Sequence, residues 1–156
     1  MKYRRLAKEQ LEALHEDFAK FLALQQIDAE EWKELKKNQP EVAEQEIDVF
    51  SDLVWEKILN KVQYLEHISP NVLNLFKCNE TNIERIVIES EIKDFSSKEN
   101  IQWILNHFHE DKIQVMKGAK NYTTKRNLEL FDLIEKGAEF SKGELFEAIL
   151  SKDNVT

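Results

Sequence analysis

The chain has 156 residues, of which 42% are hydrophobic and 33% charged, with a formal net charge of −8 at pH 7. This length suits one compact domain and is short for two, so we expect a single domain over residues 1–156. The acidic charge argues against general binding to nucleic acid or to anionic membranes, because phosphate groups repel a net-negative surface.

The N-terminal region reads as helical. Residues 6–26 place leucine and phenylalanine at steps of three and four, which predicts one amphipathic helix. A second helix is expected to begin at Asp28, a residue type that caps helix N-termini, with Glu31 completing a capping box.

A third and longest helix is expected from about Glu41 to about Glu66. Pro40 suits its first turn, and apolar residues recur at three- and four-residue steps along the whole range. Ser69 and Pro70 are expected to end it.

Beyond Pro70 the pattern changes to short aliphatic runs. Residues 72–78 and 83–92 are separated by Asn-Glu-Thr-Asn, which predicts a β-hairpin. A capping-box pair, Ser96 and Glu99, then predicts a helix, and residues 112–118 read as a third strand.

Two further helices complete the chain. One is expected from about Thr124 to Lys136, with Gly137 as its C-terminal stop. The last is expected to be capped by Ser141 and to end near Leu150, leaving residues 151–156 as a frayed tail.

This order of three helices, two strands, a helix, a strand and two helices predicts an α+β fold. We expect a mostly helical single domain with a small three-stranded sheet. A right-handed crossover between the second and third strands would make that pair parallel and the sheet mixed.

A basic segment interrupts this acidic chain. From Lys112 to Leu128 there are five basic residues and no acid. A helix start within it would add backbone N–H groups and a favourable dipole, which is the chemistry of an anion site. The candidate anion-binding residues are Lys117, Lys120, Thr124, Lys125 and Arg126. No phosphate-loop pattern supports them, so a solvated or internally paired basic surface, and a protein or nucleic-acid contact, stay open.

The expected long helix carries the opposite charge. The candidate acidic interaction face consists of Glu44, Asp48, Asp52 and Glu56, spaced four residues apart. Like charges at this spacing destabilise a helix, so water, the basic segment, the N-terminal Lys2, Arg4 and Arg5, a cation or a partner is needed to offset them. Carboxylates from one helix cannot surround a metal ion, and we expect neither a metal nor a cofactor.

No arrangement of catalytic residues is evident. The four histidines do not form a ligand or acid–base motif, and Cys78 reads as a structural thiol without a nearby histidine in sequence. A single cysteine excludes an internal disulfide framework, and no apolar run approaches the roughly 20 residues that span a bilayer. Because the N-terminal stretch also lacks the apolar run of a signal peptide, we expect a cytoplasmic protein.

Residues 40–67 and 136–150 together resemble an uncharacterised family of short acidic proteins from Bacteroidetes. The similarity runs along the whole chain. Since no activity is assigned to that family, the resemblance implies a bacterial single-domain protein and supplies no site residues.

Two functions are compatible with these patterns. The first is a non-enzymatic domain that contacts a protein partner, or further copies of itself, through its segregated acidic and basic surfaces. The alternative is a small enzyme or sensor that binds a phosphorylated small molecule at the loop from Gly118 to Arg126 and the helix start that follows. The absence of a reaction-specific motif favours the first.

Overall fold

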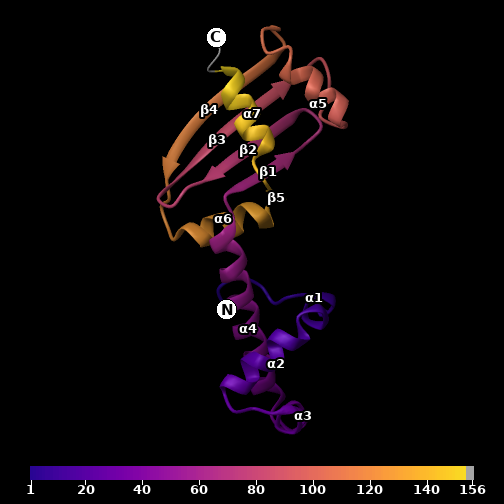
Figure 1. Cartoon of the computed structure of the whole chain (residues 1–156), viewed down its shortest axis with the longest axis vertical. Coiled ribbons are helices and arrows are strands. Elements are labelled where there is room, and N and C mark those ends of the chain that lie inside the picture. Colours follow the sequence, from indigo (N-terminus) through magenta and orange to yellow (C-terminus); the bar gives the residue numbers. More distant parts are fainter. Residues whose placement is uncertain (154–156) are drawn as a thin grey trace. The chain divides into compact units, whose positions relative to one another are not determined.

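The computed structural model describes residues 1–153, and the chain groups into two compact units, Met1–Asn60 and Lys61–Thr156. Each unit is described by itself (Figure 1). The expectation of one domain stays a prediction.

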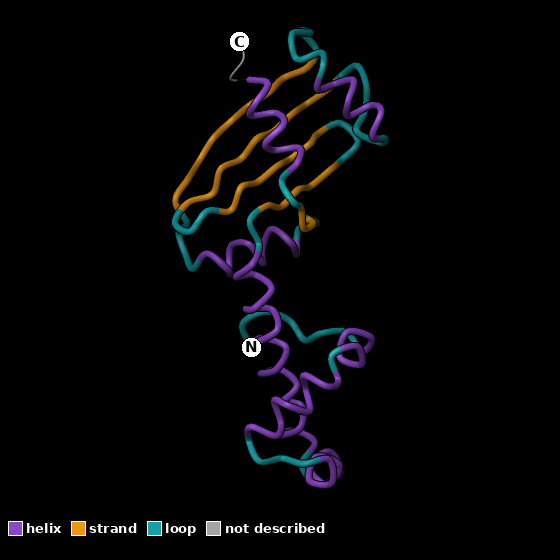
Figure 2. Tube along the Cα trace, in the orientation of Figure 1, coloured by secondary structure: helices purple, strands orange, loops and turns teal. Residues whose placement is uncertain are grey.

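Seven helices and five strands lie within residues 1–153 (Figure 2). The helices are α1 (Lys8–Ala13), α2 (His15–Leu24), α3 (Ala29–Asn38), α4 (Pro40–Lys61), α5 (Lys98–Leu105), α6 (Arg126–Glu135) and α7 (Glu144–Asp153). The strands are β1 (Tyr64–Ile68), β2 (Val72–Cys78), β3 (Asn82–Ser90), β4 (Ile113–Asn121) and β5 (Glu139–Ser141). The α+β class is confirmed. The three-stranded mixed sheet is wrong, because the strands form one antiparallel sheet in the order β4-β3-β2-β1-β5.

The first unit is helical, with an aromatic cluster inside it. The expected first helix is two helices, since Leu14 ends α1 and begins α2. The ring centroid of Phe18 lies 5.0 Å from that of Phe50 on α4 and 5.2 Å from that of Trp32 on α3. The α3 start is confirmed, because Asp28 Oδ1 accepts a hydrogen bond from the Glu31 N–H at 2.8 Å.

The long helix α4 begins at Pro40, as expected, but ends at Lys61, and the next residues form β1 instead of a last helical turn. Leu65 fits both patterns, since it continues the helical stripe and also faces Phe76 across the β1–β2 pair. The tight turn at Ser69, whose N–H donates to the Val72 carbonyl at 2.9 Å, brings β2 back along this segment. Ser69 and Pro70 therefore mark a hairpin turn and not a helix end.

The hairpin of β2 and β3 is confirmed, but β4 runs antiparallel to β3. Ser90 pairs with Ile113, so the chain leaves and re-enters the sheet at the same end. The connection, residues 91–112, consists of loops and the short helix α5, and it brings the chain back to the end of the sheet that it left. This helix starts one residue later than expected, because Ser97, and not Ser96, accepts the capping bond from the Asn100 N–H.

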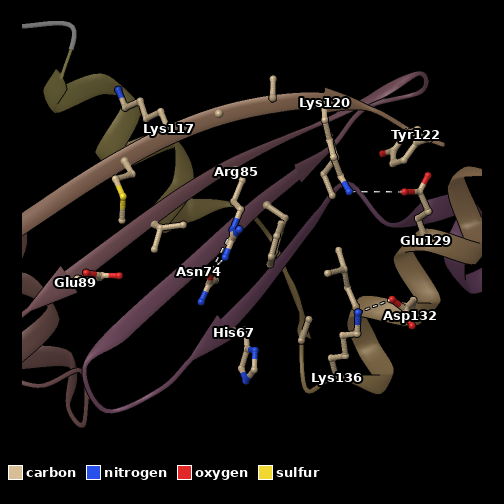
Figure 3. A pocket seen from close by; sticks show the side chains of 18 residues that line it. His67, Asn74, Arg85, Glu89, Lys117, Lys120, Tyr122, Glu129, Asp132 and Lys136 are labelled. Carbon is tan, nitrogen blue, oxygen red and sulfur yellow. Dashed lines mark hydrogen bonds and ion pairs between the residues drawn. The ribbon is translucent and has the colours of Figure 1, made fainter.

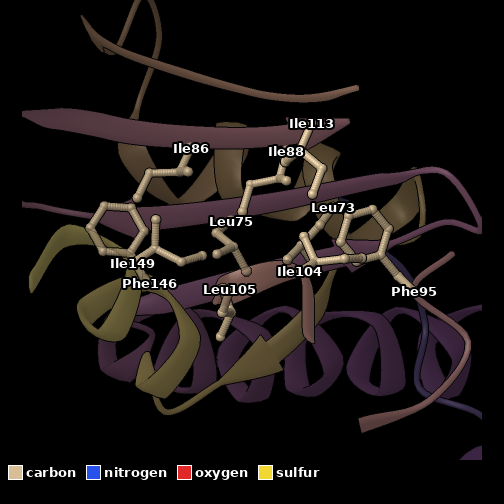
Figure 4. Close-up of a cluster of buried hydrophobic side chains, with 10 residues drawn as sticks. All are labelled: Leu73, Leu75, Ile86, Ile88, Phe95, Ile104, Leu105, Ile113, Phe146 and Ile149. Carbon is tan, nitrogen blue, oxygen red and sulfur yellow. The ribbon is translucent and has the colours of Figure 1, made fainter. Parts of the chain in front are cut away.

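One face of the sheet is packed against α5 and α7 and is called the covered face. Leu73 and Leu75 of β2 point to it, as do Ile86 and Ile88 of β3, following the two-residue period of a strand. Figure 4 shows this cluster, which consists of Leu73, Leu75, Ile86, Ile88, Phe95, Ile104, Leu105, Ile113, Phe146 and Ile149. The burial of these aliphatic and aromatic side chains is the main stabilising term for the sheet.

The opposite face carries α6 and is called the groove face. Lys120 of β4 lies 3.9 Å from Glu129 near the start of α6, and the ring of His67 of β1 lies beside Gly137 just after its end. Gly137 is confirmed as the stop of α6: its φ is 114°, and a Cβ there would lie 3.0 Å from His67 Nε2. Because these two contacts involve strands separated by β2 and β3, α6 crosses the sheet.

The C-terminal part corrects two further expectations. Residues Glu139–Ser141 form β5 beside β1, a strand too short to leave a period in the sequence. Ser141 therefore belongs to a strand, and its Oγ accepts a hydrogen bond from the Gly143 N–H before α7 begins. Of the expected tail, residues 151–153 belong to α7, while 154–156 lie outside the described residues.

Candidate functional site

The predicted acidic face lies on α4, and the chain's own N-terminal residues pair with it. Arg5 Nε donates to Asp48 Oδ1 at 2.6 Å, and a second guanidinium nitrogen lies 3.6 Å from Glu44. The hydrogen bond from Arg5 holds the pKa of the Asp48 carboxyl below its usual range. One arginine thus offsets the repulsion between two successive acids of the helix.

The other two acids of this face accept hydrogen bonds from residues 2 and 3. The backbone N–H groups of Lys2 and Tyr3 donate to the two oxygens of Asp52, at 2.7 and 2.9 Å. The Tyr3 hydroxyl donates to Glu56, and burial together with this bond raises the pKa of Tyr3. Residues 2–6, which we call the N-terminal strap, therefore lie along the acidic stripe.

The strap is also held in place by two contacts that do not involve the acidic residues. The Leu6 N–H donates to Ser51 Oγ at 3.1 Å, and both residues are buried. The Arg4 guanidinium lies 5.0 Å from the ring centroid of Trp55, a cation–π distance. A partner of the acidic stripe would have to displace these contacts.

Among the predicted anion ligands, Arg126 forms hydrogen bonds with other residues of the fold. Its Nε donates to the Asn79 carbonyl at 3.0 Å, and one terminal nitrogen donates to the carbonyls of Cys78, at 3.2 Å, and Val62. The other terminal nitrogen donates to Asn127 Oδ1 at 2.9 Å. Arg126 thus joins the start of α6 to the end of β2 and to the residue that follows α4.

Cys78 lies in this same buried environment. Burial raises the pKa of its thiol to about 12, even though the nearby Arg126 acts in the opposite direction. Because the thiolate is the nucleophilic form, this cysteine is a poor nucleophile at neutral pH. The neighbouring Tyr122 donates its hydroxyl to the Asn79 carbonyl at 2.9 Å, and burial raises its pKa to about 12.

The remaining anion candidates do not converge on one point. The Thr124 N–H donates to a Glu129 carboxylate oxygen at 3.3 Å, and the same carboxylate faces Lys120. Lys125 is exposed at the residue before α6. Figure 3 shows Lys120 directed toward Glu129, whereas Lys117 points away from it. An acid therefore already lies where the anion was expected, although an anion site here stays a prediction.

A groove of about 780 Å³ lies on the groove face, beside α6 (Figure 3). Its apolar lining comes from Phe76, Val87 and Met116 of the sheet and from Leu133 and Ala138. α6 covers only part of this face, and Met116 stays 46% exposed. The groove thus offers apolar contact area that the fold itself leaves open.

Polar side chains surround this apolar lining. Arg85 donates to Asn74 Oδ1 at 2.6 and 3.2 Å, and its guanidinium lies 5.8 Å from the Phe76 ring centroid. Lys136 pairs with Asp132 on α6 at 2.9 Å. A few hydrogen-bonding groups around an apolar surface are typical of a ligand-binding or active site.

Gly118 widens this groove at β4. It faces Arg85 across the β3–β4 pair, and a Cβ placed on it would meet no atom within 4 Å. Glycine inside a strand weakens it and often marks a place where another backbone or a ligand comes close. Sequence reasoning placed Gly118 in an anion loop, and the mid-strand glycine was the one signal that could have indicated the groove.

Neither a metal centre nor a membrane segment is evident in residues 1–153. No group of three or more His, Cys, Asp or Glu residues in this range has a metal-binding arrangement. None of the helices described here combines the length and the apolar character that a bilayer crossing requires.

The role of Arg126 predicts the effect of its replacement. Arg126→Met keeps the apolar stem but leaves the carbonyls of Val62, Cys78 and Asn79 without these donors, which should lower the free energy of unfolding by about 2–4 kcal/mol. The exposed neighbour supplies the control, since Lys125→Met should change it by less than about 0.5 kcal/mol. Equal urea midpoints for the two variants would contradict the structural role.

The strap predicts a pH dependence. A carboxyl group whose pKa is lowered by folding stabilises the fold above its ordinary pKa, and this is lost as the pH falls through the folded value. At neutral pH, Asp48→Asn should therefore be less stable than the wild type by about 0.2–1 kcal/mol. This difference should shrink as the pH falls below the ordinary aspartate pKa of about 3.9 and vanish once Asp48 is protonated in the folded protein.

The control for this pH dependence is the same substitution in an Arg5→Gln background, where it should have little effect. Thermal unfolding of the four proteins across the pH series measures both differences. A wild-type advantage that persists in acid would rule out the Arg5–Asp48 pair as its source.

No curated protein and no solved structure matches the chain. A family model described as a family of unknown function, DUF6495, matches residues 1–153. This match extends over nearly the whole chain, as the resemblance to an uncharacterised family implied, and it assigns no activity to the groove or to the strap. The chain therefore belongs to the DUF6495 family.

Proposed function

We propose that the chain is a non-enzymatic binding domain that holds a segment of another protein in the groove beside α6. The carrying observation is that α6 covers only part of the groove face, so that Met116 and the partly exposed Val87 line an open apolar surface. An apolar surface with a polar rim is typical of protein contact sites. The expectation of a bacterial, cytoplasmic protein is part of this proposal.

The groove is a better candidate than the segregated charges. The acidic stripe of α4 already pairs with the N-terminal strap, so a basic partner would have to replace the Arg5, Tyr3 and Lys2 contacts. Self-association through the acidic and basic surfaces would also have to replace these contacts of the strap. We therefore favour a partner that binds the second unit.

Binding of a phosphorylated small molecule is less well supported. Arg126 directs its guanidinium at backbone carbonyls, and the Glu129 carboxylate accepts a hydrogen bond from Thr124 at the start of α6. A phosphate at that position would be repelled by this carboxylate.

Gly118 allows a direct test of the groove. A displayed library of random nine-residue peptides, matched to the length of β4, is selected on the wild-type chain. The Cβ of Gly118→Phe would meet open space, and its ring should occupy the groove. Its melting temperature should stay close to that of the wild type, while the selected peptides should bind at least about tenfold more weakly.

The matched control for this test is Gly118→Ala, which adds only a methyl group in open space and should keep peptide binding. Selected peptides that bind the phenylalanine variant as tightly as the wild type would overturn the proposal. A selection that yields no specific peptide would overturn it as well.

A further inference from the structure

We infer that the occupant of the groove is an extended acidic segment that pairs, as a sixth strand, with the outer edge of β4. This inference rests on the proposed function and names its partner. β4 ends the sheet, and no other strand within residues 1–153 pairs with its outer side. Addition of a strand to such an edge is a common way of binding an extended peptide, because main-chain hydrogen bonds supply affinity.

The hydrogen bonds of β4 show which of its backbone groups face outward. The Glu91 N–H donates to the Lys112 carbonyl, and the Tyr122 N–H donates to the Thr81 carbonyl. In an antiparallel pair, hydrogen-bonding residues alternate along the strand, so even-numbered residues of β4 bond to β3. Odd-numbered residues such as Val115 and Ala119 therefore direct their N–H and C=O groups away from the sheet.

β4 has few of the features that protect the edges of natural sheets. The other edge strand, β5, has three residues, whereas β4 has nine and contains no proline. Its protection consists of lysines, which discourage pairing with uncharged strands. The same lysines make the edge selective for a strand of opposite charge.

The charge around β4 favours an acidic occupant. Lys112, Lys117 and Lys120 are exposed on or beside the strand, within a stretch of 17 residues, 112–128, that contains no acid. Lys112 and Lys120 share the face of Gly118, whereas Lys117 lies on the other face. Glutamate or aspartate opposite Lys112 and Lys120 would gain the cross-strand stabilisation of opposite charges. Lys120 lies 3.9 Å from Glu129, but its side chain stays 69% exposed, so it can still contact an incoming acid.

The same charge argues against a second copy of this chain as the occupant. An antiparallel pairing of β4 with β4 about its central residue would place Lys117 opposite the same lysine of the other copy. Like charges in directly opposite positions destabilise such a pair. An acidic segment of another protein fits better.

The position of Gly118 links this edge to the groove. Successive side chains of an added strand point to opposite faces of the sheet, so every second one would enter the groove beside Gly118 and Met116. The open space at Gly118 gives such a side chain room. Edge pairing would thus supply affinity, and the groove would select the side chains.

A synthetic peptide probes the charge preference. Its nine residues alternate glutamate with valine, and a counterpart carries lysine in place of glutamate. Fluorescence anisotropy should show the acidic peptide binding the wild-type chain at least about tenfold more tightly than the basic one. Equal affinity for the two peptides, or no binding of the acidic one, would overturn the inference.

A pair of variants probes the backbone pairing. Ala119→Pro removes an outward N–H group, a change that edge strands tolerate, and should lower the affinity for the acidic peptide at least about tenfold. Ala119→Thr keeps this N–H group and should bind the peptide as tightly as the wild type does. N-methylation of alternate residues in the peptide gives the same test without altering the protein. Unchanged binding after both modifications would overturn the strand pairing.

The two proposals fail in different ways. If library peptides lose binding with Gly118→Phe but not with Ala119→Pro, and show no excess of acidic residues, the groove stands and the edge-strand inference falls. If Gly118→Phe has no effect on any peptide, both fall.

Discussion

The antiparallel pairing of β4 with β3 is the constraint on which the rest of the second unit depends. With Ser90 opposite Ile113, the connection through α5 stays at one end of the sheet and β4 is left as the last strand. Val115 and Ile113 continue the covered face, while Met116 and Gly118 continue the groove face. A parallel β4 would have required a connection that returns along the length of β3, and it would have presented a different edge.

The two faces of this sheet differ in how completely helices cover them. The covered face buries a continuous set of aliphatic and aromatic side chains against α5 and α7, which supplies most of the stabilisation. On the groove face, α6 lies over only part of the sheet and is tied down at its start by Arg126 and at its end by Gly137 beside His67. The main buried core and the open apolar groove thus lie on opposite sides of one sheet.

The sequence predicted the features that local rules determine. The cap at Asp28, the β2–β3 hairpin and the stop at Gly137 follow from side-chain hydrogen bonding, strand period and a positive φ, and all three are present. β1 was missed because Leu65 suits a helical stripe as well as a strand. Only the pairing with β2, a non-local interaction, selects the strand.

The sequence shows where the charged residues cluster, but not which groups their side chains contact. The acidic stripe of α4 was identified, and the N-terminal basic residues that pair with it were one of several open possibilities. Arg126 appeared to belong to an anion site, whereas its guanidinium points to backbone carbonyls that come together only in the folded chain. The groove was not predicted, since it depends on how α6 lies on the sheet.

Amide hydrogen exchange along β4 in the free protein tests the central claim most directly. If β4 pairs with β3 on one side only, the N–H groups of Met116 and Gly118 are protected, while those of Val115 and Ala119 exchange at least about tenfold faster. Uniform protection along the strand, or an alternation of the opposite phase, would contradict an open outer edge of β4.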